Sequence, residues 1–138
     1  MNQIIQKEHL NPNSAEVASR EKQLAELLEG GDVLCAHVYD DDGCSEYLFR
    51  KSPENIANFI GSRPDVHQIV LTDDQERPIL WTIGYFIDRC PDMVLLEEVK
   101  KALIPIQMGE KEAQPVFSPS IGEVVAYQLR MMNRGGTV

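Results

Sequence analysis

Side chains that can bind a metal ion fall on one face of a predicted β-hairpin. Cys35 and His37 are two residues apart on its first strand. Counting residues across the turn places Glu46 opposite His37. Cys44 then lies on the same face, nearer the turn and opposite Tyr39. Thiolate, imidazole and carboxylate bind zinc in proteins, but this spacing matches no established zinc-finger pattern, and buried cysteines are common without a metal. We therefore expect a half-covered sheet face, with no metal and no cofactor.

The turn of the same hairpin resembles part of a calcium-binding loop in composition only. If Gly43 took the position of the sharp-turn glycine in an EF-hand, Asp40 and Asp42 would fit as ligands. Val38 would then fall at the first ligand position and Phe49 at the position of the bidentate glutamate. Neither side chain can bind calcium, so the pattern excludes an EF-hand.

Acidic turns are the second candidate feature. Nine acidic and three basic residues lie between positions 32 and 74, which gives this part a charge of -6 out of the total of -9. If the sheet is a meander, two turns project from the same edge and form an acidic rim that attracts a basic partner or a cation. The alternative is that aspartate is simply a good turn former. The predicted acidic rim consists of Asp40, Asp41, Asp42, Asp73 and Asp74.

Cys90 is a candidate reactive thiol. It stands beside Arg89 at the predicted start of a helix, where the helix dipole and the cation both favour a thiolate. Cysteine is also an inert apolar residue in most cores, and this is the alternative. His9 lies in a predicted tail, and we expect His67, at the start of a strand, to make an edge contact.

Catalytic motifs are absent from the sequence. It has no phosphate-binding glycine loop and no H-E-x-x-H, C-x-x-C or G-x-S-x-G pattern. We therefore assign no catalytic residue, and binding is favoured over catalysis.

The elements that position these residues follow from the period of the apolar side chains. A helix is predicted from Asn13 or Ser14 to about Glu29, because apolar residues recur there at helical spacing and two glycines follow. Ser52 and Pro53 begin a short second helix, Cys90 and Pro91 open a third that Pro105 ends, and Ser120 with Glu123 forms a capping box before a fourth. Alternation with a period of two predicts strands over 34–39, 45–49, 66–72 and 79–87.

These segments predict an α+β fold. Four strands in two hairpins form an antiparallel sheet with helices packed on it, in the order α-β-β-α-β-β-α-α. The strand over 79–87 is apolar on both faces, which is typical of a strand covered on two sides. The two hairpin-then-helix units also suggest an internal repeat. The alternative is that any two such units have acidic turns and a proline at the start of the helix. We expect a flexible tail over 1–12, a single domain over 13–112, and a linker and C-terminal helix over 113–138.

The C-terminal helix is the predicted contact surface with a partner or a second copy of the chain. We expect Val125 and Leu129 to dock the helix on its own core and Met131, which lies off that stripe, to stay exposed. An adaptable apolar side chain beside arginines is the composition of an interface core. A helix packed wholly on its own sheet is the alternative. The predicted interface residues are Val124, Leu129, Arg130, Met131 and Met132.

Composition limits the class of function. A net charge of -9 disfavours direct binding to nucleic acid or to an anionic membrane. The first dozen residues have no signal-peptide core and no apolar run is long enough to span a bilayer, so we expect a cytoplasmic protein with free thiols.

We expect this protein to act by protein–protein interaction, as an accessory or regulatory partner or as a homo-oligomer. One alternative is a sensor or enzyme with a small-molecule pocket between the sheet and its helices, walled by Trp81, Tyr85 and Tyr47. Another is an acidic decoy that imitates DNA, although the acidic block is too local to favour it.

Overall fold

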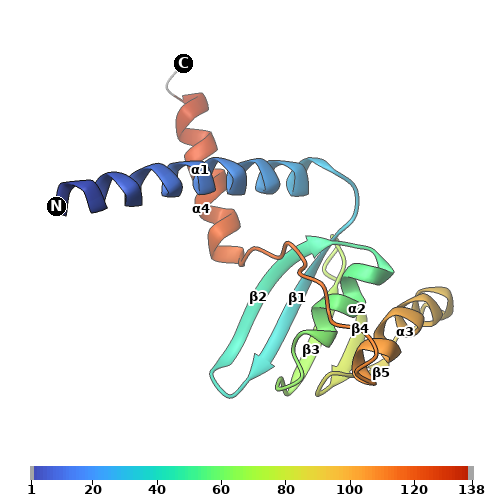
Figure 1. Ribbon diagram of the computed structural model, residues 1–138. Helices are drawn as coiled ribbons and strands as arrows, with labels where there is room; N and C mark the ends of the chain where they lie inside the picture. The colour runs from blue at the N-terminus through green and yellow to red at the C-terminus, as the bar shows by residue number, and fades with distance from the viewer. Residues whose placement is uncertain (1, 137–138) are drawn as a thin grey trace.

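The computed structural model describes the backbone of residues 2–136 and the side chains of residues 15–134. The fold is α+β, as predicted, but its antiparallel sheet has five strands rather than four. Figure 1 shows α2 and α3 beside the sheet, with α1 and α4 crossing each other at its far end. The elements are α1 (Asn2–Glu29), β1 (Val33–Asp40), β2 (Gly43–Arg50), α2 (Pro53–Gly61), β3 (Gln68–Thr72), β4 (Pro78–Ile83), β5 (Phe86–Arg89), α3 (Met93–Gln107) and α4 (Ile121–Gly136).

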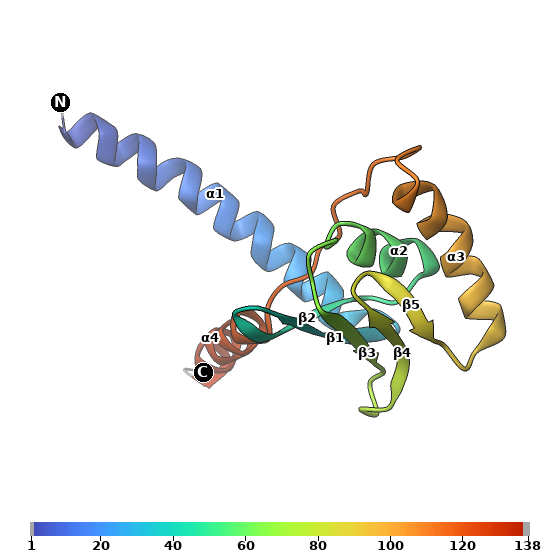
Figure 2. The same ribbon diagram turned by 90° about the horizontal axis from the view of Figure 1, so that it is seen from below.

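The sheet order is β2-β1-β3-β4-β5, and α2 and α3 pack on one of its two faces (Figure 2). Alternate residues of β1 and β3 point into the core against these helices, because successive side chains of a strand point to opposite faces. The opposite face, called the open face below, carries Val33, Cys35 and His37, which are only half-buried. The core includes Leu34, Ala36, Phe49, Ile56, Phe59, Ile60, Ile69, Leu71, Leu80, Val99 and Leu103.

The first hairpin has the predicted register. His37 pairs with Glu46 and Tyr39 with Cys44, and Asp41 and Asp42 form the turn. Gly43 follows the turn with a φ of 122°, a conformation that side chains with a Cβ rarely adopt. The length of the turn therefore determines which side chains face each other across β1 and β2.

The prediction of one strand over 79–87 is wrong, because the chain turns at Gly84 and Tyr85 and forms β4 and β5. Gly84 has a φ of 59°, and the hydroxyl of Thr82 donates a hydrogen bond of 2.7 Å to its carbonyl. The expectation that this segment is covered on both faces is also wrong. Leu80 and Thr82 are fully buried, whereas Ile83 is 64% exposed.

The helix caps agree with the sequence in part. The hydroxyl of Ser52 accepts the amide hydrogen of Asn55, as expected for the cap of α2. The cap of α3 is Asp92 rather than Cys90, and α3 continues through Pro105 to Gln107. A proline costs less here than in mid-helix, because only one turn follows it and the amide of Met108 still reaches the Ile104 carbonyl at 2.9 Å.

Two helices far apart in the sequence lie against each other. The backbone of α1 is helical from Asn2, so the predicted start at Asn13 or Ser14 is wrong. The guanidinium of Arg20 binds both carboxylate oxygens of Glu123 on α4, at 2.6 and 2.8 Å. The Glu123 carboxylate therefore does not accept the Ser120 amide hydrogen, as a full capping box requires. Of the predicted capping box, the bond from the Glu123 amide to the Ser120 hydroxyl is formed.

The segment before α4 is attached to the edge of the sheet. Pro119 is fully buried, its carbonyl accepts the amide hydrogen of Leu48 at 3.0 Å, and Ser120 forms a bridge with Tyr47. This pairing covers part of the outer edge of β2. In the part of the chain that the structure describes, no helix has both the length and the apolar character needed to cross a membrane.

Candidate functional site

Three of the four predicted metal-binding side chains come together on the open face. The Nδ1 atom of His37 lies 3.3 Å from Oε2 of Glu46, and the sulfur of Cys35 lies 3.8 Å from the same oxygen. Their donor atoms all lie within 4.8 Å of one another. Cys44, next to Tyr39 across the hairpin, is not part of this group. The Cys35–His37–Glu46 cluster therefore places three different metal-binding groups around one point.

A residue from β3 orients the imidazole of the cluster. Thr72 pairs with Cys35 in the ladder between β1 and β3, and its Oγ1 lies 3.2 Å from Nε2 of His37. The same oxygen is 3.4 Å from the carbonyl of Cys35. His37 is therefore held from both ring nitrogens, by Thr72 on one side and Glu46 on the other. Sequence spacing could not identify Thr72, because its position depends on strand order.

The pKa of Cys35 reflects its surroundings. Burial, and after it the neighbouring Glu46 carboxylate, raise the pKa of this thiol to about 11. In the absence of a cation, Cys35 is a neutral thiol that donates its hydrogen to Glu46. It is therefore a poor nucleophile in this state, because the thiolate is the reactive form.

A groove of about 620 Å³ lies over the cluster. Leu28 at the end of α1, Leu48 of β2 and Ile121 at the start of α4 form its apolar wall. Glu46, Asp73, Asp74 and Glu76 supply four carboxylates, and no lysine or arginine is among the described residues that line it. Arg77, just outside the lining, pairs with Asp73 at 3.2 Å and offsets one of these charges. The groove is thus a concave site with a negative charge. Trp81, Tyr85 and Tyr47, the expected walls of a small-molecule pocket, do not line it.

The predicted acidic rim is wrong in its geometry. β1 is antiparallel to β3, with Cys35 opposite Thr72 and Tyr39 opposite Gln68. Asp73 and Asp74 therefore follow β3 beside the start of β1, whereas Asp40, Asp41 and Asp42 lie at its far end. The two acidic turns are at opposite ends of the sheet and form no single surface, so a binding role for either turn stays a prediction.

Each acidic turn makes local hydrogen bonds. Asp73 accepts the amide hydrogens of Gln75 and Arg77 at 2.9 Å each. The backbone hydrogen bond from Arg77 is the main reason why the pKa of Asp73 lies below its usual value. In the other turn, Asp40 accepts the amide hydrogen of Asp42 at 2.9 Å, and exposed Asp41 lies 2.6 Å from Nε2 of His67, just before β3. The bonds to backbone amides are typical of aspartates that stabilise turns.

The environment of Cys90 opposes the predicted reactive thiol. Its side chain is only 6% exposed and lies close to the Asp92 carbonyl, at 3.5 Å. Burial is the largest influence on this thiol and raises its pKa. The expected lowering by the helix dipole fails because the helix begins two residues later, at its Asp92 cap.

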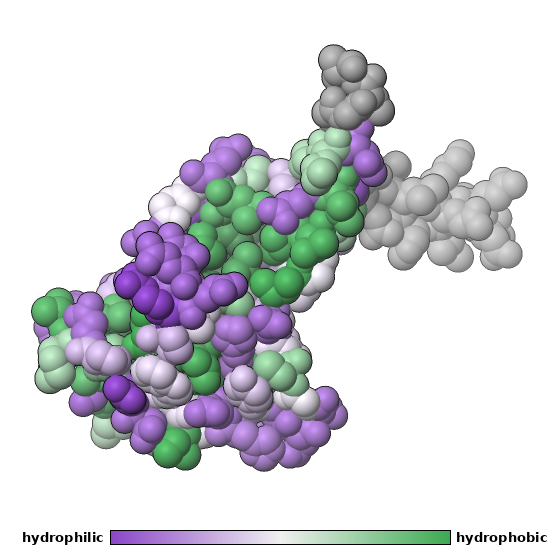
Figure 3. All heavy atoms as spheres, turned by 180° about the vertical axis from the view of Figure 1, so that it is seen from behind, coloured by the Kyte–Doolittle hydropathy of each residue, from purple (hydrophilic) through white to green (hydrophobic). Residues whose placement is uncertain are grey.

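α4 presents the opposite face to that predicted. Val124 is 4% exposed and Met131 is half-buried, so these residues turn toward the rest of the molecule. Val125 and Leu129, expected to dock the helix, are 46% and 54% exposed. Figure 3 shows hydrophobic side chains gathered on the side where α4 rises toward the C-terminus. Of the predicted interface residues, Leu129 and Met132 are exposed, and Arg130 is engaged with Glu21 at 3.1 Å.

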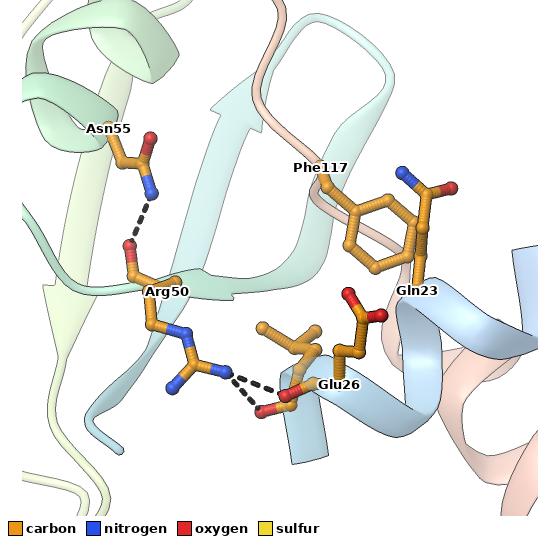
Figure 4. A pocket seen from close by; sticks show the side chains of 6 residues that line it. Gln23, Glu26, Arg50, Asn55 and Phe117 are labelled. Atoms are coloured by element: carbon orange, nitrogen blue, oxygen red, sulfur yellow. Dashed lines mark hydrogen bonds between the residues drawn. The ribbon is translucent and has the colours of Figure 1, made fainter. Parts of the chain in front are cut away.

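A second pocket, of about 220 Å³, marks the joint between α1 and the sheet. In Figure 4, Arg50 points to the end of α1, where it donates hydrogen bonds to the carbonyls of Glu26 and Leu27 at 2.8 and 3.1 Å. Asn55 holds the Arg50 carbonyl from the other side, at 2.8 Å. A cation at the C-terminal end of a helix satisfies its last carbonyls. Arg50 and Arg20 thus anchor α1, and the sequence offered only the Gly30–Gly31 helix stop as a signal for this joint.

The chain was compared with protein-family models, with curated proteins and with solved structures, and none of the three comparisons finds a match. The geometry of the cluster, the groove and the α4 surface is therefore the basis for the functional proposals.

Proposed function

We propose that this protein acts by protein–protein association and that the exposed face of α4 is its contact surface with a second copy of the chain. The observation that supports this is an apolar stripe of three residues. Val125, Leu129 and Met132 are spaced by four and three positions, which places them on one face of the helix. They are 46%, 54% and 68% exposed. The helix docks on its own molecule through other residues, so this stripe is free to bind.

The distribution of charge favours a second copy at this face. The chain carries a net charge of -9, so two copies repel each other over most of their surfaces. Residues 113–138 contain one glutamate and two arginines and are the part with a positive balance. Contact through α4 therefore adds little charge repulsion, because its glutamate and its arginines are paired with residues of α1. A straight helix with one apolar stripe also suits a two-fold arrangement, in which the same stripe packs on itself.

The three cysteines suit a reducing compartment. None of them is paired in the structure, and disulfides rarely persist in the cytoplasm. We therefore place the protein in the cytoplasm as part of this proposal. The decoy alternative fits less well, because imitation of DNA needs a continuous line of carboxylates, and the two acidic turns lie at opposite ends of the sheet.

Sedimentation equilibrium of the purified chain and of Leu129→Glu tests the proposal. We expect a dimer for the wild-type chain and a monomer for the variant, because a carboxylate in the centre of an apolar contact is costly to bury. Added salt should strengthen the wild-type dimer, since it screens the repulsion between two acidic molecules.

Val94→Glu is the matched control. Val94 is 76% exposed on α3 and gains the same charge, so this variant should dimerise like the wild-type chain. A wild-type chain that stays monomeric across the dilution series, or a Leu129→Glu variant that still dimerises, contradicts the proposal. Circular dichroism checks that each variant is folded.

A further inference from the structure

Two of the distances between donor atoms in the Cys35–His37–Glu46 cluster match those between the ligands of a tetrahedral zinc ion. Zinc binds nitrogen and oxygen at about 2.0–2.2 Å and sulfur at about 2.3 Å, so a tetrahedron has N–O edges of about 3.3 Å and S–O edges of about 3.5 Å. The corresponding distances here are 3.3 Å from His37 to Glu46 and 3.8 Å from Cys35 to Glu46. Two of the three edges therefore agree with a zinc site within a few tenths of an ångström. The third, between the Cys35 sulfur and the His37 nitrogen, lies within 4.8 Å, an upper bound longer than the edge of about 3.5 Å in a tetrahedron.

The charge of the groove independently favours a cation. Glu46, Asp73, Asp74 and Glu76 line it, and among the described residues no lysine or arginine does; Arg77, outside the lining, pairs with Asp73 at 3.2 Å and leaves the other three carboxylates without a lysine or arginine in the groove. A half-enclosed site focuses this negative charge, which raises the local concentration of cations. The cluster lies on the floor of the groove, where His37 is 27% and Glu46 48% exposed. An ion can therefore enter from solvent.

Thr72 is placed to orient the imidazole when a metal is bound. Metal-binding histidines usually use one ring nitrogen for the ion and donate the other N–H to a fixed acceptor. When Nδ1 of His37, which faces Glu46, binds the ion, the ring proton is on Nε2, which then donates to Thr72 Oγ1, 3.2 Å away. The hydroxyl then directs its own hydrogen to the Cys35 carbonyl at 3.4 Å. This arrangement satisfies every hydrogen in the group and leaves the Nδ1 lone pair available to an ion.

We propose that Cys35, His37 and Glu46 bind a zinc-type divalent cation on the floor of the groove, with the fourth coordination position open to the groove. The thiol and imidazole select zinc and similar borderline-soft ions over magnesium and calcium, which prefer oxygen ligands. Three protein ligands and an open position are typical of zinc sites that exchange a water or a substrate. Binding displaces the proton of the Cys35 thiol, so affinity falls as the pH is lowered.

The same residues also line up as hydroxyl, imidazole and carboxylate, in the order Thr72, His37, Glu46. A hydrolase with this triad must stabilise an oxyanion. The neighbouring turn cannot do so, because the amides of Gln75 and Arg77 donate to Asp73. The carboxylates of the groove repel a developing negative charge as well. The negative charge of the groove thus opposes a hydrolase mechanism and favours the binding of a cation.

Native mass spectrometry of the chain with zinc tests the site, after treatment with a chelator to remove any bound ion. We expect one zinc per chain, and with Co²⁺ in its place an absorption band from charge transfer between sulfur and cobalt. Cys35→Ser and Glu46→Gln should each abolish uptake at the concentration that saturates the wild-type chain. Thr72→Val keeps all three ligands and should weaken binding by about 10–100-fold, the usual effect of losing the partner that orients a metal-binding histidine.

Cys44→Ser is the matched control, since Cys44 shares the hairpin face but lies outside the cluster. It should bind zinc like the wild-type chain and keep the cobalt–sulfur band. No zinc uptake by the wild-type chain, uptake retained in Glu46→Gln, or uptake lost in Cys44→Ser would overturn the proposed ligand set. Glu46 is half-exposed, so its substitution remains informative if Cys35→Ser does not fold. The Leu129→Glu variant should bind zinc normally, which separates this site from the proposed dimer.

Discussion

At the scale of single residues, Thr82 of β4 connects β3 to the turn before β5 through one buried hydroxyl. Its Oγ1 accepts the amide hydrogen of Ile69 at 2.8 Å and donates to the carbonyl of Gly84 at 2.7 Å. The side chain is fully buried, so water cannot replace either bond. The hydroxyl therefore links β3 to the turn at which β4 ends and β5 begins.

We expect Thr82→Val to lower the free energy of unfolding by about 1–3 kcal/mol, because it leaves the Ile69 amide and the Gly84 carbonyl without this partner. Urea denaturation measures the change. Thr82→Ser keeps the hydroxyl and loses one methyl group, so it should cost less than Thr82→Val. Equal losses in the two variants would show that packing, and not hydrogen bonding, determines the role of Thr82.

At the scale of elements, α2 and α3 approach each other closely at Gly61. A Cβ atom at this position would lie 2.7 Å from Cγ2 of Ile106, a distance that forces one of the two helices or the isoleucine to move. Ile106 lies in the last turn of α3, beyond Pro105. The continuation of α3 through the proline thus places an isoleucine against the glycine of α2.

Gly61→Ala should destabilise the protein by about 1–3 kcal/mol, the usual cost of overpacking a close contact. Gly122→Ala is the control, because Gly122 lies in the first turn of α4 and the nearest atom to its added Cβ is 3.9 Å away. There alanine should be neutral or stabilise the helix by about 0.5–1 kcal/mol. Thermal denaturation of both variants checks the pair, and a neutral Gly61→Ala would show that Ile106 rearranges freely.

At the scale of the whole molecule, ion pairs join α4 to α1. Arg20 binds Glu123, and Glu21 lies 3.1 Å from Arg130 and 3.6 Å from Arg134. The hydrogen bond from Arg20 is the main cause that lowers the pKa of Glu123 below its ordinary value of 4.5. A lowered carboxyl pKa in the folded state means that the pair stabilises the fold above pH 4.5. This contribution is lost as the pH falls through the lower, folded value.

Glu123→Gln should therefore destabilise the protein at neutral pH, by up to about 1 kcal/mol because the pair is partly exposed. The difference between the variant and the wild-type chain should disappear in acid, where Glu123 is protonated. Urea denaturation at several pH values measures it. Glu97→Gln, which alters an exposed carboxylate of α3, should not show this pH-dependent difference. A Glu123→Gln effect that persists in acid would mean that the carboxylate charge is not its source.

The sequence alone determined the type of most elements and the register of the first hairpin. Ser52 and Pro53 predict the start of α2 because a cap and the first turn are local features. The pairing of His37 with Glu46 follows from the length of one turn, which counts residues on a single piece of chain. The sequence did not predict the turn at Gly84. This glycine lies inside an apolar run whose pattern suits one long strand equally well.

Only the tertiary structure decided which distant segments meet. The strand order places Thr72 beside Cys35, puts the two acidic turns at opposite ends of the sheet and builds the groove from α1, α4 and three strands. The packing of α4 on α1 and β2 buries Val124 and leaves Leu129 exposed. These contacts join residues far apart in the chain. Periodicity shows that a helix has an apolar face, but the partner that covers it depends on packing between elements and leaves no local signal.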